Sequence, residues 1–200
     1  IVSTGSSTYD EIDFCVNFLK EHRCSEIILL QCTSKYPCSI ESLNLSVIPK
    51  MKSKYNLPIG FSDHSIDPII APLVSIGLGA TVIEKHFTLD KNLPGPDHFF
   101  ALTPNELKQM IDSIRNTELA YGTGKKEVLE EEVKTRKFAK RSLQAISDIS
   151  KGDILELGIN FDILRPGDRL RGLEARFVTD IIGKKSKLDV EKGDGINEYE

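Results

Sequence analysis

Apolar residues follow two alternating patterns along the first half of the chain. Short apolar runs of strand length lie at 1–4, 27–32, 58–61 and 81–83. Between them, apolar residues recur at the three- and four-residue intervals of a helix with one buried face. Alternating strand and helix segments predict a parallel sheet with helical crossovers. The expected class is therefore α/β, and four such units make either an open sheet or half of an eight-unit barrel.

The first residues of the predicted helices carry clear start signals. Thr8 followed by Glu11, and Thr103 followed by Glu106, are capping boxes, and Pro104 suits a first helical position. The last helix should bury a stripe made of Leu107, Met110, Ile111 and Ile114. The expected helices span 9–22, 40–52 with an interruption near Pro49, three or more turns within 65–79, and the segment from 104 onward.

The composition changes after residue 120. Residues 121–136 are rich in Gly, Lys and Glu, which predicts a solvated linker that can include some helix. From 137 onward, short β-like segments alternate with Gly-centred turns, and a Lys-Gly-Asp turn in 148–153 recurs in 189–194. We therefore expect one domain over 1–120, a linker over 121–136, and a compact pseudo-symmetric β domain over 137–200.

Charge and composition exclude several classes of protein. A net charge of −4 and a pI near 5.7 give no electrostatic footprint for nucleic acid. There is no apolar run long enough for a membrane span, and the four cysteines lack metal-ligand spacing. We expect reduced thiols and a cytoplasmic protein. The chain opens without Met, in what resembles the middle of a strand, so we expect a truncated start.

Two histidines follow neighbouring predicted strands. His64 ends one strand and His86 ends the next, so both should lie at the carboxyl edge of the sheet, where parallel α/β folds place their sites. Asp63 and Glu84 are expected to orient the rings by hydrogen bonds. A lone histidine at a strand end is more often structural, but the pair predicts a divalent metal site.

Several motifs occur together across nearly the whole chain, and jointly they resemble the N-acetylneuraminate (sialic acid) synthase family. They are Ser-Asp-His at 62–64, Ile-Glu-Lys-His-Phe-Thr at 83–88, Gly-Pro-Asp-His at 95–98, Arg-Ser-Leu at 141–143, Asp-Ile-Ser-Lys-Gly-Asp at 148–153 and Arg-Pro-Gly at 165–167. The resemblance implies the C-terminal half of a (β/α)8 TIM barrel, from about the fifth strand, followed by a small antifreeze-like (SAF) domain. It also implies that the chain alone, without the first four strands, is inactive.

The resemblance further implies a reaction and a metal. Enzymes of this family condense phosphoenolpyruvate with N-acetylmannosamine or a related N-acetylhexosamine, giving a nine-carbon 2-keto acid and phosphate. His64 and His86 match the family's ligands for Mn²⁺ or Mg²⁺. The intact Gly-Pro-Asp-His motif favours the sialic or legionaminic type over pseudaminic acid synthases. Two other readings remain open: a metal-dependent barrel aldolase or hydrolase, and a non-catalytic carbohydrate-binding remnant.

The resemblance also implies roles for individual residues. Asp97 joins the two histidines as a catalytic candidate and, with Tyr36, faces the sugar, whereas His98 is structural or close to the substrate. The family forms a domain-swapped homodimer in which an arginine of the small domain reaches the partner's sugar site. The remaining substrate-binding candidates are Ser34 and Ser62 for phosphate and carboxylate, Phe138 where the linker enters the site, and Arg165 as the arginine that acts across the dimer.

Overall fold

A computed structural model describes residues 1–200 and divides them into two compact units, residues 1–125 and residues 126–200. The boundary lies inside the stretch that was expected to be a linker. This stretch includes a 3-10 turn over Glu130–Glu132 that leads into helix α5 at Val133–Ala139, which extends past the expected end of the linker at residue 136.

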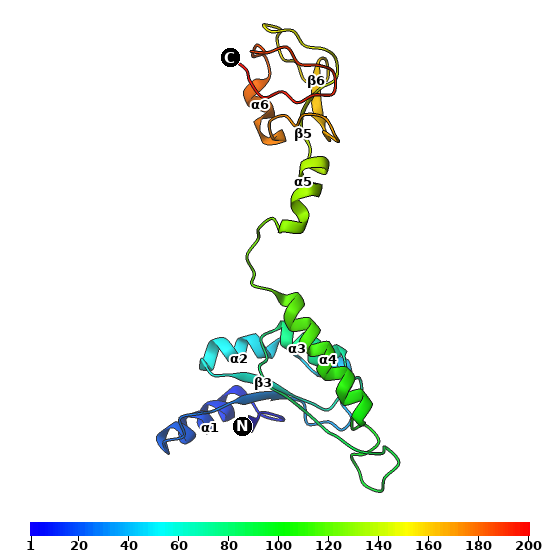
Figure 1. Cartoon of the computed structure of the whole chain (residues 1–200). Coiled ribbons are helices and arrows are strands. Elements are labelled where there is room, and N and C mark those ends of the chain that lie inside the picture. The colour runs from blue at the N-terminus through cyan, green and yellow to red at the C-terminus, as the bar shows by residue number, and fades with distance from the viewer. The chain divides into compact units, whose positions relative to one another are not determined.

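The first unit is a curled sheet of parallel strands with helical connections, as Figure 1 shows. The strand order follows the sequence, β1-β2-β3-β4, and Cys32 pairs with Ser62, which pairs with Glu84. The α/β class is therefore confirmed. The strands are β1 (Val2–Ser3), β2 (Leu29–Cys32), β3 (Ile59–Asp63) and β4 (Ile83–Lys85), and the helices are α1 (Tyr9–Glu21), α2 (Val47–Tyr55), α3 (Ile70–Gly77) and α4 (Pro104–Tyr121).

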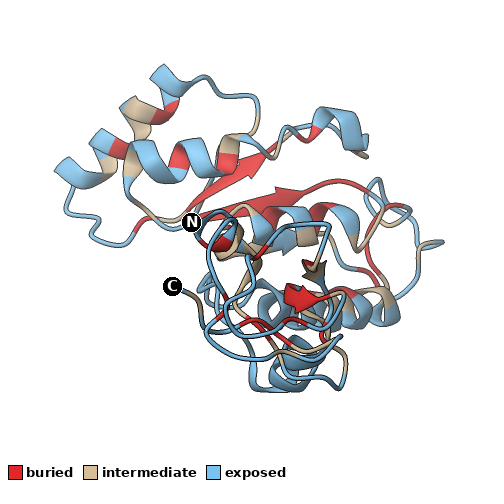
Figure 2. Ribbon diagram, turned by 90° about the horizontal axis from the view of Figure 1, so that it is seen from above, coloured by how far each residue is buried: buried red, intermediate tan, exposed pale blue.

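One face of the sheet packs against the helices. Leu29, Ile59 and Phe61 are fully buried there together with Ile48 and Met51 of α2, and Figure 2 shows the central strands as buried. Side chains alternate between faces along a strand, so the residues between these apolar positions occupy the concave face. The concave positions become polar toward the carboxyl ends of the strands, which is where the candidate site lies.

Two helices differ from the expected bounds. The stretch 40–52 forms a 3-10 turn at Ile40–Ser42 and then α2, and Pro49 lies inside the first turn of α2 instead of interrupting the helix. A proline is tolerated there because the first amides of a helix have no intrahelical partner. Helix α3 is shorter than expected, because Asp67 Oδ1 accepts hydrogen bonds from the amides of Ile69 and Ile70 and thereby sets its start.

The start signals of α1 and α4 are confirmed. Both Thr8 with Glu11 and Thr103 with Glu106 form complete capping boxes. The buried stripe of α4 is narrower than expected, because Ile111 is exposed whereas Met110 and Ile114 are buried.

No helix combines the length and the apolar character that crossing a membrane requires. All four cysteines are free thiols.

The second unit is a small β-rich body. Strands β5 (Ser142–Ala145) and β6 (Phe161–Leu164) pair antiparallel over a core that includes Leu143, Leu155 and Ile196. It also contains a 3-10 turn at Ala175–Phe177 and the short helix α6 at Val178–Ile181.

The repeated Lys-Gly-Asp turns of the second unit face each other. The amide of Lys151 donates to Asp189 Oδ1 at 2.7 Å, and the amide of Lys192 donates to Asp148 Oδ1 at 2.8 Å. An antiparallel bridge between Ile149 and Val190 joins the two copies. Each turn therefore receives its cap from the other copy, which is the local two-fold relation that the repeat predicted.

Candidate functional site

The two histidines lie together at the carboxyl ends of β3 and β4. Their ring centroids are 5.3 Å apart. Two aromatic side chains complete the cluster: the ring of Tyr36 lies 4.1 Å from that of His64, and the ring of Phe100 lies 4.9 Å from that of His86. The expectation that consecutive strand ends bring these histidines side by side is met in the structure.

The ring of His64 is held by a backbone carbonyl. Its Nδ1 lies 2.9 Å from the carbonyl oxygen of Thr33, and the side chain is buried. A carbonyl oxygen only accepts, so Nδ1 carries the hydrogen and the neutral ring keeps a lone pair on Nε2. Cys32 Sγ approaches the same Nδ1 at 3.9 Å. This orientation leaves one nitrogen of His64 available as a ligand.

His86 is paired with a carboxylate that comes from a loop. Its Nδ1 lies 3.6 Å from Asp97 Oδ2, which brings together two of the predicted catalytic residues. His98 fixes this loop, because its Nδ1 contacts Thr88 Oγ1 at 2.8 Å and that hydroxyl also donates to the carbonyl of Asp90. In this structure His98 therefore has a structural role. Asp97 lies on the Nδ1 side of the His86 ring, so it does not occupy Nε2.

The expected partners of the two rings are wrong. Asp63 pairs with Lys85 at 2.6 Å, and Glu84 accepts a hydrogen bond from Ser62 Oγ at 2.8 Å. Neither carboxylate contacts a histidine, because strand alternation turns Asp63 to the helix-facing side and register places Glu84 opposite Ser62. Burial lowers the pKa of Lys85, and the neighbouring carboxylate of Asp63 opposes that effect.

The two serines are placed differently. Ser62 is buried and its hydroxyl is already engaged with Glu84, so binding an anion there requires that bond to break. Ser34 is exposed and follows β2 in the chain, but it lies close to Gly5, which follows β1. A Cβ on Gly5 would lie 2.2 Å from Ser34 Oγ and 2.9 Å from Cys32 Sγ. Gly5 therefore allows this close approach. The predicted contacts of both serines with phosphate stay predictions.

Phe138 and Arg165 belong to the second unit. The amide of Gly167 donates to the carbonyl of Phe138 at 3.3 Å, so the end of α5 meets the Arg-Pro-Gly turn that carries Arg165. Phe138 also lines a cavity together with Arg169 and Arg171. The structure thus brings the two predicted residues of this unit into one region of its surface.

The two histidines suit a metal ion. Nδ1 of His64 faces the Thr33 carbonyl and Nδ1 of His86 faces Asp97, so Nε2 is the remaining ring nitrogen of each, and imidazole is a ligand for several divalent metals. No group of three or more His, Cys, Asp or Glu side chains is arranged to hold a metal, so an ion bound here would need water or substrate oxygens as further ligands.

Sequence reasoning missed the groups that support the rings. They are the carbonyl of Thr33, the thiol of Cys32 and the ring of Phe100. It also missed the ion pair of Lys85 with Asp63, although these two residues carry opposite charges at the positions just before the two histidines.

The fold and the site define an α/β protein that carries a pair of histidines at the carboxyl edge of a curled parallel sheet. The chain belongs to the NeuB family, whose model matches residues 1–126.

Similar proteins extend this likeness over both units. The chain is 42% identical over 198 residues to a pseudaminic acid synthase of Campylobacter jejuni, covering 99% of this chain and 56% of that one. It is 32% identical over 199 residues to the human N-acetylneuraminate-9-phosphate synthase, covering 99% and 54%. A solved sialic acid synthetase of Leptospira borgpetersenii matches with a TM-score of 0.61 and 37% identity, covering 68% of this chain and 48% of that one. The chain thus spans little more than half the length of these curated relatives.

Proposed function

We propose that the chain is the C-terminal part of a nonulosonic acid synthase. The reaction would join phosphoenolpyruvate to an N-acetylated amino sugar, giving a nine-carbon 2-keto acid and inorganic phosphate. The observation that carries this proposal is the pair formed by His64 and His86, with their rings 5.3 Å apart in a chain of the NeuB family. The relatives named as synthases support the same reaction class.

His64 and His86 would hold Mn²⁺ or Mg²⁺ through Nε2, and the bound ion would supply Lewis acidity toward the sugar aldehyde. In the balanced reaction, the enol carbon of phosphoenolpyruvate forms a bond to the aldehyde carbon, whose oxygen takes up a proton. Water adds at the neighbouring carbon, and the bond between that carbon and the phosphate oxygen breaks, releasing phosphate. The Thr33 carbonyl and Asp97 hold the two rings so that Nε2 of each stays open.

The aromatic side chains around the histidines supply a wall for a substrate. Tyr36 packs on His64 and leaves half of its own surface exposed, so one face of the ring remains available to a sugar. Asp97 is also exposed and can accept hydrogen bonds from hydroxyl groups. These groups suit a neutral polyhydroxylated ligand better than an anion.

Relatives that are named for different products have similar identity to the chain. The pseudaminic acid synthase shares 42% of its aligned residues with the chain, and the solved sialic acid synthetase shares 37%. We therefore propose the class of N-acetylated hexosamine substrates and keep the sialic, legionaminic and pseudaminic types within it.

The test of this proposal uses the full-length protein with His86→Ala and a matched control, His22→Ala. His22 is an exposed histidine at the end of α1. We expect wild type and His22→Ala to bind Mn²⁺ and to release phosphate from phosphoenolpyruvate only when an amino sugar is present. His86→Ala should bind Mn²⁺ at least about a hundredfold more weakly, since even changing a residue that orients a ligand costs roughly 10–100-fold. Wild-type protein without Mn²⁺ binding or turnover would support a non-catalytic remnant instead.

We also propose that the second unit is an antifreeze-like domain that serves the partner's site in a domain-swapped homodimer. The reciprocal caps between its two Lys-Gly-Asp turns support a pseudo-symmetric module of this kind. Arg165 is exposed beside the turn that meets Phe138, so its guanidinium can reach a ligand outside its own unit.

A mixing experiment tests this arrangement. Arg165→Ala and His86→Ala protomers are each expected to be nearly inactive as homodimers. If Arg165 acts across the dimer, a mixed dimer carries one site with both defects and one site with neither, and activity returns toward half per dimer. Mixed dimers that form but remain inactive would show that Arg165 serves its own barrel or no site.

A further inference from the structure

A buried ion pair lies directly behind the two histidines. Asp63 and Lys85 are partners in the register between β3 and β4, and each immediately precedes one of the histidines. Lys85 Nζ lies 2.6 Å from Asp63 Oδ2, and the two side chains are 3% and 0% exposed. Because side chains alternate along a strand, this pair occupies the helix-facing side while His64 and His86 occupy the other.

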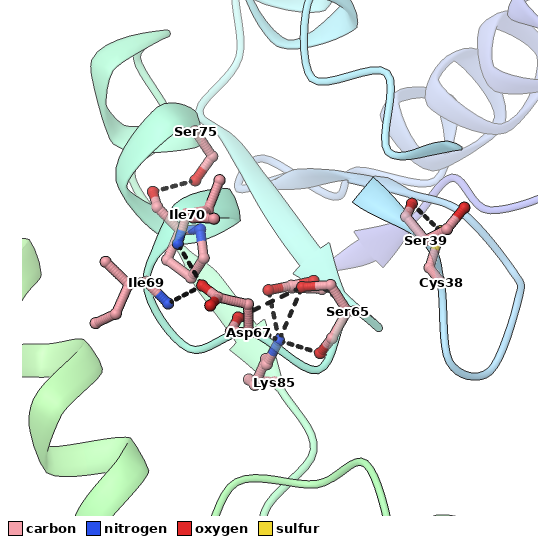
Figure 3. Close-up of polar contacts among 10 residues, drawn as sticks. Cys38, Ser39, Ser65, Asp67, Ile69, Ile70, Ser75 and Lys85 are labelled. Carbon is pink, nitrogen blue, oxygen red and sulfur yellow. Dashed lines mark hydrogen bonds and ion pairs between the residues drawn. The ribbon is translucent and has the colours of Figure 1, made fainter. Parts of the chain in front are cut away.

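The ammonium of Lys85 also contacts the loop that follows β3, as Figure 3 shows. It donates to the carbonyl of Ser65, and it lies 3.3 Å from Ser65 Oγ and 3.4 Å from the carbonyl of Asp67. Asp63 Oδ1 accepts a hydrogen bond from the amide of Ser65 at 2.7 Å. One cation therefore ties the end of β4 to Ser65 and Asp67 of the loop that leads into α3.

The backbone on both sides of His64 is fixed by these contacts. Asp63 before it and Ser65 after it both bind Lys85, and the carbonyl of His64 itself accepts a hydrogen bond from the amide of Cys38 at 2.8 Å. Lys85 itself directly precedes His86 in the chain. The ion pair on the opposite face of the sheet thus joins the two strand positions that immediately precede the two rings.

Stability alone gives no reason for such a pair. Desolvation of two buried charges offsets their attraction, and apolar residues of similar size often serve as well or better. What an apolar pair does not provide is a set of directed bonds to the Ser65 and Asp67 carbonyls. Those bonds specify the position of the loop and therefore of His64.

We propose that Asp63 and Lys85 are positioning residues whose ion pair sets the separation of His64 and His86 and thereby the affinity of the site for a divalent metal ion. This inference rests on the proposed metal site. Residues that orient metal ligands typically change affinity 10–100-fold when they are removed. We expect a change of that size when either member of the pair loses its charge.

The experiment compares Lys85→Met and Asp63→Asn with a matched control, Lys54→Met, in the full-length protein. Lys54 forms an ion pair with Asp13 at 2.9 Å between α2 and α1, near the start of β3 and away from the histidines. Two quantities are measured: NOEs between the ring protons of His64 and His86 without metal, and the dissociation constant for Mn²⁺ by electron paramagnetic resonance. Methyl signals of buried Ile48 verify the fold.

The expected result is loss of the ring NOEs and a roughly 10–100-fold weaker Mn²⁺ affinity in Lys85→Met and Asp63→Asn, with neither change in Lys54→Met. A folded Lys85→Met protein with wild-type NOEs and wild-type affinity would overturn the proposal. If Lys85→Met does not fold, Asp63→Asn decides in the same way, because its Oδ1 can still accept the Ser65 amide. If wild type binds no Mn²⁺, the metal proposal fails, and the NOE comparison still decides whether the pair positions the rings.

Discussion

Protonating Glu106 should weaken the first unit in acid. Glu106 Oε2 accepts hydrogen bonds from the amide and the hydroxyl of Thr103 at the start of α4, and Oε1 binds Lys91 at 2.7 Å. Lys91 belongs to the loop that carries Asp97 toward His86, so Glu106 links that loop to the helix. The Lys91 ammonium and the Thr103 amide lower the pKa of Glu106 from its ordinary 4.5 to about 2.

The magnitude follows from this displacement of the pKa. At 1.36 kcal/mol per pKa unit, it corresponds to about 3.4 kcal/mol in the free energy of unfolding. The side chain is 31% exposed, so solvent screening reduces the value, and we expect about 1–1.5 kcal/mol. The folded-state pKa is depressed, so this stability is present above pH 4.5 and is lost as the pH falls through 2. More than half of it should be gone near pH 3.

Urea unfolding of wild type and Glu106→Gln at pH 7 and pH 3 measures the effect. The ¹³C-methyl signal of Met110, which is buried on α4, reports the first unit. Gln keeps an acceptor for the Thr103 amide, so the variant removes only the part of the stabilisation that depends on the charge of Glu106. Glu118→Gln, which breaks the exposed pair with Arg115 on the same helix, should change stability by less than about 0.5 kcal/mol. If the free energies of unfolding of wild type and Glu106→Gln differ by the same amount at pH 7 and at pH 3, the reasoning is refuted.

Two further predictions concern glycines. Gly60→Ala should destabilise the first unit by several kcal/mol in urea unfolding, because its Cβ would lie 2.6 Å from the Val82 carbonyl oxygen. Gly77→Ala should instead stabilise this unit by about 0.5–1 kcal/mol, because nothing lies within 4 Å of the added Cβ and alanine favours the helix. Equal changes in the free energy of unfolding for the two variants would contradict this reasoning. Gly195→Ala should unfold the second unit, because its Cβ would lie 1.8 Å from the Gly172 amide nitrogen, while NMR signals of the first unit stay native; a folded second unit would contradict that steric argument.

The sequence by itself determined those features whose causes lie within a few residues. The capping boxes at Thr8 and Thr103 join residues three apart, so the starts of α1 and α4 were predictable. The apolar run before Cys32 specified a strand buried on both faces. The adjacency of His64 and His86 also followed from the sequence, because parallel strands end at one edge of their sheet.

The tertiary structure decided which groups support those histidines. The carbonyl of Thr33 binds a ring 31 residues away in the chain, and Asp97 reaches His86 from a loop that His98 holds. Strand register turned Asp63 away from the rings and toward Lys85 on the other face of the sheet. Such contacts join segments that are distant in the chain, and their partners depend on register and loop position, which no local pattern of residues specifies.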